Sequence, residues 1–131
     1  MPKILVMDDS RMMSLYLRRC LEKAGHQVVE WTPASAAEIA AMVANLAPDL
    51  VLTDYFMQGS NGATVTRMVK QAFPAMPMLV LTAFREPEME ATLLRLGVHH
   101  VLDKPIPEGL LNLAVAEALA EAAEEREEWK R

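Results

Sequence analysis

The sequence predicts an α/β fold, in which one five-stranded parallel sheet is doubly wound by helices in a (βα)5 arrangement. Short, continuous apolar runs recur five times along the chain, and such runs are typical of strands that are buried on both faces. Longer segments with helical periodicity separate these runs. Strands that alternate with helices indicate a parallel sheet with right-handed crossovers and with helices on both faces.

The first strand is expected at the apolar run Ile4–Met7. Ser10 follows in the position of a helix N-cap, where its hydroxyl oxygen can accept a hydrogen bond from a free backbone N–H. The helix after it carries an apolar stripe that comprises Met13, Leu17, Cys20, Leu21 and Ala24. Gly25 stands where this helix should end, because glycine commonly terminates helices.

The second and third strand–helix units repeat this order. The second strand is expected at Val28–Trp31, and Pro33 lies near the start of the helix that follows. The apolar stripe of that helix comprises Ile39, Val43, Leu46 and Ala47. The third strand is expected at Leu50–Thr53. The apolar stripe of the next helix comprises Val65, Met68, Val69, Ala72 and Phe73.

The last two units complete the pattern. The fourth strand is expected at Met78–Leu81, and Pro87 and Gly97 bracket the helix after it. The fifth strand is expected at Val98–Leu102. The apolar stripe of the last helix comprises Leu111, Ala114, Val115, Ala118, Leu119 and Ala122.

The composition is typical of a single cytoplasmic domain. The 131 residues are 52% hydrophobic, which is enough for one full core without disulfides. The single cysteine, Cys20, cannot form an internal disulfide and fits a core position on the first helix. No segment is long enough to span a membrane, and the apolar N-terminal run is too short for a signal peptide. A net charge of −5 and 5% aromatic residues argue against nucleic-acid binding.

Side chains that carry chemistry are expected at the carboxyl ends of the strands, where open parallel sheets bind ligands. These side chains are Asp8, Asp9, Asp54, Thr82 and Lys104. Three carboxylates at one edge repel one another unless a cation joins them, and all-oxygen ligands suit Mg²⁺. A carboxylate beside such an ion can attack a phosphoryl group and form an aspartyl phosphate. We therefore predict that Asp54 is this nucleophile, that Lys104 pairs with phosphoryl oxygens and that Thr82 donates a hydrogen bond to another.

Each of these residues also has a simpler interpretation. Asp8 and Asp9 could stabilise the N-terminus of the first helix, where acidic side chains are favourable. Taken alone, Asp54 reads as a solvated loop acid, Thr82 as an ordinary strand-end residue and Lys104 as a surface lysine. The convergence of all five residues on one sheet edge favours the functional interpretation.

Four motifs carry a resemblance to a known family: ILVMDDS, VLTDYFMQGSNG, LVLTA and VLDKPI. In this order and spacing the chain resembles the receiver domains of bacterial response regulators, the CheY-like family with a flavodoxin-like fold. The resemblance implies that Asp54 is the phosphoacceptor. It implies that Asp9 binds Mg²⁺ directly and Asp8 binds it through water, with Asp54 and the backbone carbonyl of Phe56 as further ligands and Mn²⁺ as an alternative ion.

The same resemblance assigns Thr82 as the switch hydroxyl and Lys104 as the phosphoryl contact, with a cis peptide bond before Pro105. It implies that residues 1–122 form the receiver domain and that residues 123–131 are an acidic extension of the last helix. The phosphodonor would be a phosphohistidine of a sensor histidine kinase or of a histidine phosphotransfer protein. The chain would catalyse only its own phosphorylation and dephosphorylation and would not otherwise be an enzyme.

Phosphorylation is expected to shift an equilibrium between two conformations of the fourth helix, fifth strand and fifth helix. An unknown downstream protein would dock there, and a homodimer through the fourth and fifth helices is an alternative. The chain contains no DNA-binding module.

Several switch positions differ from the family's common pattern. Gln58 stands where proline is common in the family. The resemblance also assigns switch positions to Ala83, which follows Thr82, and to Val101, which replaces the usual aromatic switch residue. Phe56 and Phe84 each stand two residues after a site residue, at positions that influence hydrolysis of the phosphoryl group in the family. We hypothesise that these two rings hinder an attacking water and lengthen the phosphorylated lifetime.

Other functions remain as alternatives. A pseudo-receiver would keep the fold and bind partners without accepting phosphate, and Phe56, Phe84 and Val101 leave this alternative open. A phosphatase with an aspartyl nucleophile would need an acid at position 56 and a substrate cap. A flavodoxin-like electron carrier would need a glycine-rich phosphate loop after the first strand, where the sequence DDSRMM is acidic instead.

Two further features are read as structural. His99 and His100 are adjacent, so on a strand they would face opposite sides, and no third ligand has metal-site spacing. The glutamate-rich segment after Ala122 is expected to be a solvated helix end. A connector to an output domain, or a helix that binds a partner, is the alternative for this segment.

Overall fold

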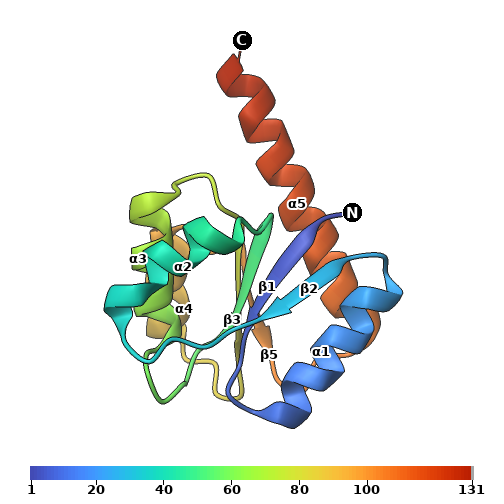
Figure 1. The fold of residues 1–131 in the computed structure, drawn as a ribbon, viewed down its shortest axis with the longest axis vertical. Helices are drawn as coiled ribbons and strands as arrows, with labels where there is room; N and C mark the ends of the chain where they lie inside the picture. Colours follow the sequence, from blue (N-terminus) through green and yellow to red (C-terminus); the bar gives the residue numbers. More distant parts are fainter. Residues whose placement is uncertain (131) are drawn as a thin grey trace.

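The computed structural model describes residues 1–130, with the side chains of residues 1–127. Five parallel strands form one sheet in the order β2-β1-β3-β4-β5 (Figure 1). The strands are β1 (Lys3–Met7), β2 (Gln27–Glu30), β3 (Leu50–Asp54), β4 (Met78–Thr82) and β5 (His100–Asp103). The predicted doubly wound (βα)5 fold is therefore confirmed.

Helices cover both faces of this sheet. They are α1 (Arg11–Lys23), the short 3₁₀ helix η1 (Ala36–Glu38), α2 (Ile39–Leu46), α3 (Gly62–Ala72), α4 (Pro87–Leu96) and α5 (Glu108–Lys130). The apolar stripes of α1 and α5 pack on one face, and those of α2, α3 and α4 pack on the other (Figure 1). β3 and β4 are buried throughout because helices cover both of their faces, which accounts for their continuous apolar sequence.

The strand prediction was least accurate at β5, which begins at His100 rather than Val98. Val98 is buried, but its N–H donates to the carbonyl of Leu93 and closes the end of α4. Gly97 makes this turn with a φ of 107°, in the left-handed region that favours glycine. The apolar run starts before the strand because the turn itself buries a valine.

The alternation expected for His99 and His100 therefore does not apply, because His99 precedes the strand. The Nε2 atom of His99 lies 3.6 Å from Glu121, and that of His100 lies 3.2 Å from Glu117. Both glutamates belong to α5, so both imidazoles reach the same helix.

The last helix, α5, extends beyond the end of the sheet, and the described chain ends on this projection (Figure 1). Its inward residues pack against the sheet as far as Ala122, and residues 123–127 are exposed. Arg131, the end of the extension expected at 123–131, lies outside the described residues. In the described part of the chain, no helix has both the length and the apolar character that crossing a membrane requires.

Candidate functional site

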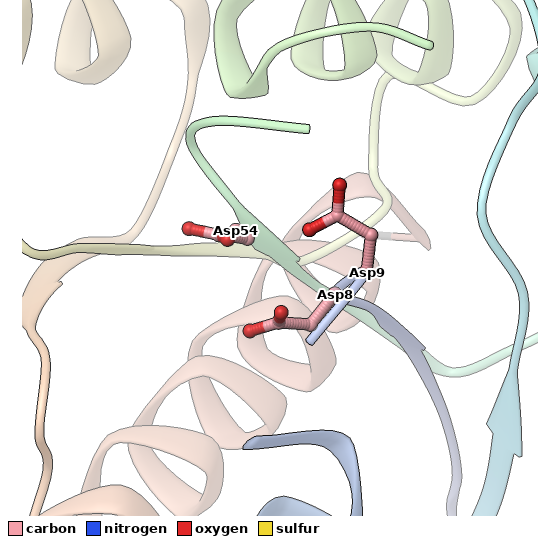
Figure 2. A group of neighbouring side chains, drawn as sticks. All are labelled: Asp8, Asp9 and Asp54. Carbon is pink, nitrogen blue, oxygen red and sulfur yellow. The ribbon is translucent and has the colours of Figure 1, made fainter. Parts of the chain in front are cut away.

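Three carboxylates meet at the carboxyl edge of the sheet, where β1 and β3 lie side by side (Figure 2). Asp8 and Asp9 follow the last residue of β1, and Asp54 is the last residue of β3. The register pairs Met7 with Thr53, so the residues that follow each of them are neighbours across the strands. One carboxylate oxygen from each aspartate lies within 4.8 Å of the others. In the sheet, β2 lies on one side of β1, and β3, β4 and β5 follow on the other side. The direction in which strands are added therefore reverses at β1, and parallel sheets bind ligands at such a switch point.

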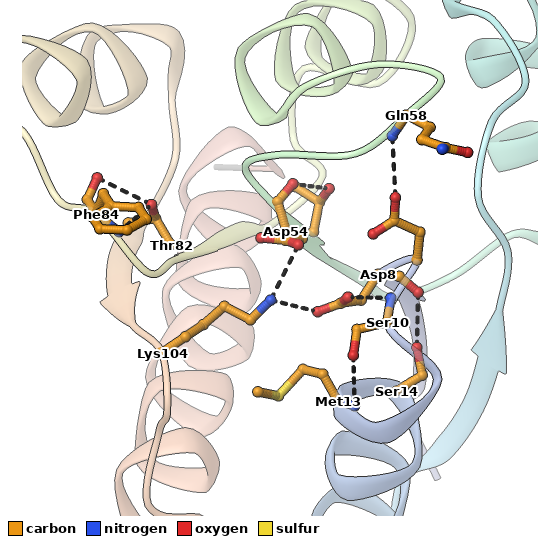
Figure 3. A network of polar contacts seen from close by, with 11 residues as sticks. Asp8, Ser10, Met13, Ser14, Asp54, Gln58, Thr82, Phe84 and Lys104 are labelled. Atoms are coloured by element: carbon orange, nitrogen blue, oxygen red, sulfur yellow. Dashed lines mark hydrogen bonds and ion pairs between the residues drawn. The ribbon is translucent and has the colours of Figure 1, made fainter.

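Lys104 brings a positive charge into this group from the end of β5. Its Nζ atom lies 2.9 Å from Asp8 Oδ2 and 3.1 Å from Asp54 Oδ2 (Figure 3). Burial opposes the charge on Lys104, but the hydrogen bonds with Asp8 and Asp54 outweigh it and raise the pKa of the ammonium. The lysine therefore stays charged and partly neutralises the two buried carboxylates. The expected cis peptide bond between Lys104 and Pro105 is present.

Asp54 is buried, with 8% of its surface exposed. Burial raises the pKa of its carboxyl group, and the negative charge of Asp8 acts in the same direction. Hydrogen bonding and charge from Lys104 oppose this rise. A bound divalent cation would favour the ionised carboxylate further, because it would replace repulsion among the acids with attraction.

Asp8 is held by two residues at the start of α1. Asp8 Oδ1 accepts a hydrogen bond of 2.9 Å from the N–H of Ser10, and the Ser14 hydroxyl donates to the carbonyl of Asp8. Ser10 itself caps α1, because its side chain accepts from the N–H of Met13. The cap that could have explained the two acids is thus supplied by a neighbouring serine, as predicted for Ser10.

The group Asp8, Asp9, Asp54 and Lys104 is brought together as predicted, but the hydroxyl of Thr82 is directed elsewhere. It accepts a hydrogen bond of 3.1 Å from the N–H of Phe84 and lies 3.2 Å from the Phe84 carbonyl, to which it donates (Figure 3). The hydroxyl therefore closes the turn after β4.

The residues assigned to switching differ in their surroundings. Val101 is buried in the core with 6% exposure, whereas Ala83 is exposed. Phe84 is 74% exposed and Phe56 is 58% exposed. The Phe56 ring packs edge-on against Tyr55, with 4.7 Å between ring centroids.

The sequence interpretation missed Arg85, which lies in the turn between β4 and α4. Its guanidinium pairs with Asp103 at 3.1 Å and with Glu90 at 3.3 Å, and it donates to the carbonyl of Val101. These contacts join the turn, α4 and β5. No sequence signal identified Arg85, because its partners come together only in the folded chain.

The interpretation also missed the contact between Gln58 and Asp9. The backbone N–H of Gln58 donates a hydrogen bond of 3.1 Å to Asp9 Oδ2 (Figure 3). The absence of proline at this position was the available signal, since any other residue offers an N–H.

The donor set fits a hard divalent cation. All three candidate side chains offer carboxylate oxygen, which Mg²⁺ prefers over nitrogen or sulfur. Oxygens on opposite sides of a Mg²⁺ ion lie about 4.2 Å apart, so ligand atoms within 4.8 Å need only small adjustments. An open groove of about 610 Å³ borders Asp8 and Asp9, which leaves space for water ligands on that side.

Comparisons with known proteins agree with this geometry. A family model described as the response regulator receiver domain matches residues 4–116. Protein PilH of Pseudomonas aeruginosa is 33% identical over 122 residues, which are 92% of this chain and 99% of PilH. The DNA-binding transcriptional regulator NtrC of Escherichia coli is 28% identical over 102 residues, which are 78% of this chain but only 21% of NtrC.

Solved structures show the same fold. A CheY-like response regulator receiver domain protein from Methanospirillum hungatei superimposes with a TM-score of 0.85 at 24% sequence identity. The match covers 95% of this chain and 98% of that one. The likeness at this level of identity concerns the fold alone, and it agrees with the strand order found here.

Proposed function

This chain belongs to the receiver domain family of response regulators, and on that premise we propose that it is a phosphorylation-controlled switch with Asp54 as its phosphoacceptor. Receiver domains are the phosphoacceptors of two-component systems rather than enzymes in the ordinary sense. One observation carries the proposal for this chain: Asp54 ends a buried strand beside two other carboxylates and a lysine that contacts it. A buried carboxylate beside a lysine and further oxygen ligands for a cation is suited to attack a phosphoryl group, because the positive charges neutralise the negative charge that gathers there.

In the proposed reaction, an oxygen of the Asp54 carboxylate attacks the phosphorus of a phosphohistidine. The new O–P bond forms as the P–N bond breaks, and the departing imidazole nitrogen takes a proton from solvent. Lys104 would pair with a phosphoryl oxygen, and it already contacts the attacking carboxylate. Asp8, Asp9, Asp54 and the Phe56 carbonyl would hold Mg²⁺, or Mn²⁺ in its place, which would neutralise negative charge on the transferring group.

Thr82 would report the reaction to the rest of the domain. Its hydroxyl now bonds to the backbone of Phe84, and a phosphoryl group on Asp54 would compete for it as an acceptor. Movement of the hydroxyl would release the turn that leads into α4. This step would couple the acid group to α4, β5 and α5, where an unknown downstream protein or a second copy of the chain would dock.

The phosphodonor would be a histidine kinase or a histidine phosphotransfer protein, with this chain in the cytoplasm. The phosphodonor would bind on the α1 side, where Met12 and Leu15 line the groove beside Asp8 and Asp9. Met12 is 85% exposed and Leu15 is 47% exposed, so both can pack against a protein that presents the phosphohistidine.

Intact-mass measurement after incubation with acetyl phosphate and Mg²⁺ tests the proposal. We expect one phosphoryl adduct on the wild-type chain and none on Asp54→Asn or in the presence of EDTA. If no adduct forms with acetyl phosphate or with a phosphorylated kinase, while the protein is folded and binds Mg²⁺, the chain is a pseudo-receiver. The exposed Phe56 and Phe84 and the buried Val101 are the features that favour this second candidate.

A further inference from the structure

The contact between Gln58 and Asp9 joins two loops that carry proposed cation ligands. Asp9 lies after β1, and Gln58 lies in the loop between β3 and α3, two residues beyond Phe56. The donor is the backbone N–H of Gln58, and the acceptor is Asp9 Oδ2 at 3.1 Å (Figure 3). The Gln58 side chain is exposed and takes no part in this hydrogen bond.

The backbone of this loop is held in place independently of the Gln58 side chain. The N–H of Met57 donates to the carbonyl of Ser60 at 3.2 Å, and Phe56 forms a bridge with Asn61. These contacts close a tight turn around positions 58 and 59.

At Gly59 the turn packs closely against the loop after β2. A Cβ atom on Gly59 would lie 1.9 Å from the carbonyl oxygen of Pro33, so only glycine allows the approach without a backbone shift. The turn therefore has a defined position, and its N–H group at 58 is aimed at Asp9 by the fold.

We propose that the N–H of Gln58 is a positioning group for cation binding, because it fixes the orientation of the Asp9 carboxylate. Asp9 is exposed, and within the described residues its carboxylate has this one hydrogen bond. A carboxylate offers about four acceptor positions, so a hydrogen bond to one oxygen leaves others for the ion. Hydrogen bonds of this kind orient metal-binding carboxylates and increase affinity for the metal. The inference rests on the proposed role of Asp9 as a ligand.

Proline at position 58 would remove the donor, and it would also fix its own φ and restrict the backbone of Met57. The first test compares Gln58→Pro with Gln58→Ala, which keeps the N–H and removes only an exposed side chain. Calorimetric titration with MgCl₂ should give a Kd within twofold of wild type for Gln58→Ala. Gln58→Pro should bind Mg²⁺ roughly threefold to tenfold more weakly, below the usual range for such groups because Asp9 is exposed.

The outcomes separate this inference from the proposed function. Equal Mg²⁺ affinity in the two variants, or tighter binding by Gln58→Pro, would overturn the positioning role and leave the phosphoacceptor intact. Failure of the wild-type chain to bind Mg²⁺ would overturn the cation site and the inference together.

Amide hydrogen exchange provides a second test that does not depend on a folded proline variant. In Asp9→Ala, without metal, the Gln58 amide should exchange at least severalfold faster than in wild type. The Met57 amide, which donates to Ser60 in the same loop, should keep its exchange rate and shows whether the turn is intact. An unchanged rate at Gln58 would mean that Asp9 does not hold this N–H in solution.

Discussion

The two sides of the carboxyl edge are built differently. On the side of β1 and β3, the acidic cluster (Asp8, Asp9 and Asp54) has its carboxylates close together, and Lys104 pairs with two of them. On the side of β4 and β5, the Thr82 hydroxyl closes its own turn and Arg85 fastens that turn to neighbouring elements. The first side contains a set of groups suited to one reaction, and the second contains contacts that the reaction would have to rearrange.

This difference separates chemistry from signalling. The acidic cluster and Lys104 supply the groups that the proposed reaction uses, whereas Thr82 and Arg85 on the second side hold the turn after β4 in place. In this chain Arg85 contacts the carbonyl of Val101, so a guanidinium joins the turn to β5. The comparison predicts large effects of substitution in the cluster and small, local effects on the other side.

The largest effect is expected from Lys104→Met, which removes the cation between two buried carboxylates. The side chains of Asp8 and Asp54 are only 1% and 10% exposed, so water can screen their repulsion only weakly. In EDTA at pH 7 we expect the free energy of unfolding to fall by about 2–4 kcal/mol, measured by urea denaturation. Mg²⁺ should restore part of this loss, because it supplies positive charge at the same place.

Lys23→Met is the matched control for that experiment. Lys23 lies 3.5 Å from Glu108, but this pair is on the surface, with 76% and 44% of the side chains exposed. We expect a change within about 0.5 kcal/mol. Equal losses in the two lysine variants would mean that the cluster is no more dependent on its cation than a surface pair.

A smaller effect is expected from Asp54→Asn, and it depends on pH. Because the pKa of Asp54 is raised above its ordinary value of 3.8, ionisation is less favourable in the folded chain than in the unfolded chain. The associated stability is present below pH 3.8 and is lost as the pH rises through the folded pKa. In EDTA, Asp54→Asn should therefore be more stable than wild type at pH 7, and its advantage should shrink as the pH falls toward 3.8.

Urea denaturation over this pH range measures the difference. Addition of Mg²⁺ at pH 7 should favour wild type instead, since the asparagine lacks the charge that binds the ion. An asparagine variant that is less stable than wild type at pH 7 in EDTA would show that Lys104 more than compensates for burial.

The third effect concerns the two exposed rings. If Phe56 and Phe84 hinder an attacking water, the double change Phe56→Ser with Phe84→Ser should speed loss of the phosphoryl group. We expect a rate increase of roughly tenfold, or about 1.4 kcal/mol in activation free energy. The decay of the adduct, followed by intact mass after removal of acetyl phosphate, measures this rate.

Leu113→Ser on α5 is a control with similar exposure, 56% against 58% for Phe56. Its decay rate should equal that of wild type. An unchanged rate in the double variant would reject the hypothesis that the rings lengthen the phosphorylated lifetime.

The accuracy of the sequence interpretation follows the same division between the two sides. The strands and the acidic cluster could be predicted because they depend on short-range patterns: apolar runs, caps and the topology of a parallel sheet. Cys20 is buried on α1 as predicted, and Ser10 caps that helix. The start of β5 was misplaced because a buried apolar residue such as Val98 can belong to a turn as well as to a strand.

The remaining contacts could not be predicted because they depend on loop backbone and on distant partners. Arg85 meets Asp103 across 18 positions of sequence, and Gln58 meets Asp9 across 49. The direction of the Thr82 hydroxyl is a rotamer choice that sequence patterns do not encode.

The smallest effect is expected from Arg85→Ala. The side chains of Arg85 and Asp103 are 36% and 68% exposed, so the free energy of unfolding should fall by about 0.5–1 kcal/mol in urea denaturation. The Phe84 amide, which donates to Thr82, should exchange faster because the turn loses its attachment to β5. Arg85→Lys should restore little of this protection, because lysine lacks the planar donor fork.

Combining Arg85→Ala with Lys104→Met tests whether the two sides are independent. The two residues share no hydrogen-bond or ion-pair partner among the described residues: Lys104 pairs with Asp8 and Asp54, and Arg85 contacts Glu90, Asp103 and Val101. In EDTA the losses should therefore add to within about 0.5 kcal/mol. A larger deviation would mean that the two sides are already coupled in the unphosphorylated chain, so that phosphorylation would adjust an existing link. Additive losses would mean that the two sides are independent in the unphosphorylated chain, so that any coupling would have to arise on phosphorylation.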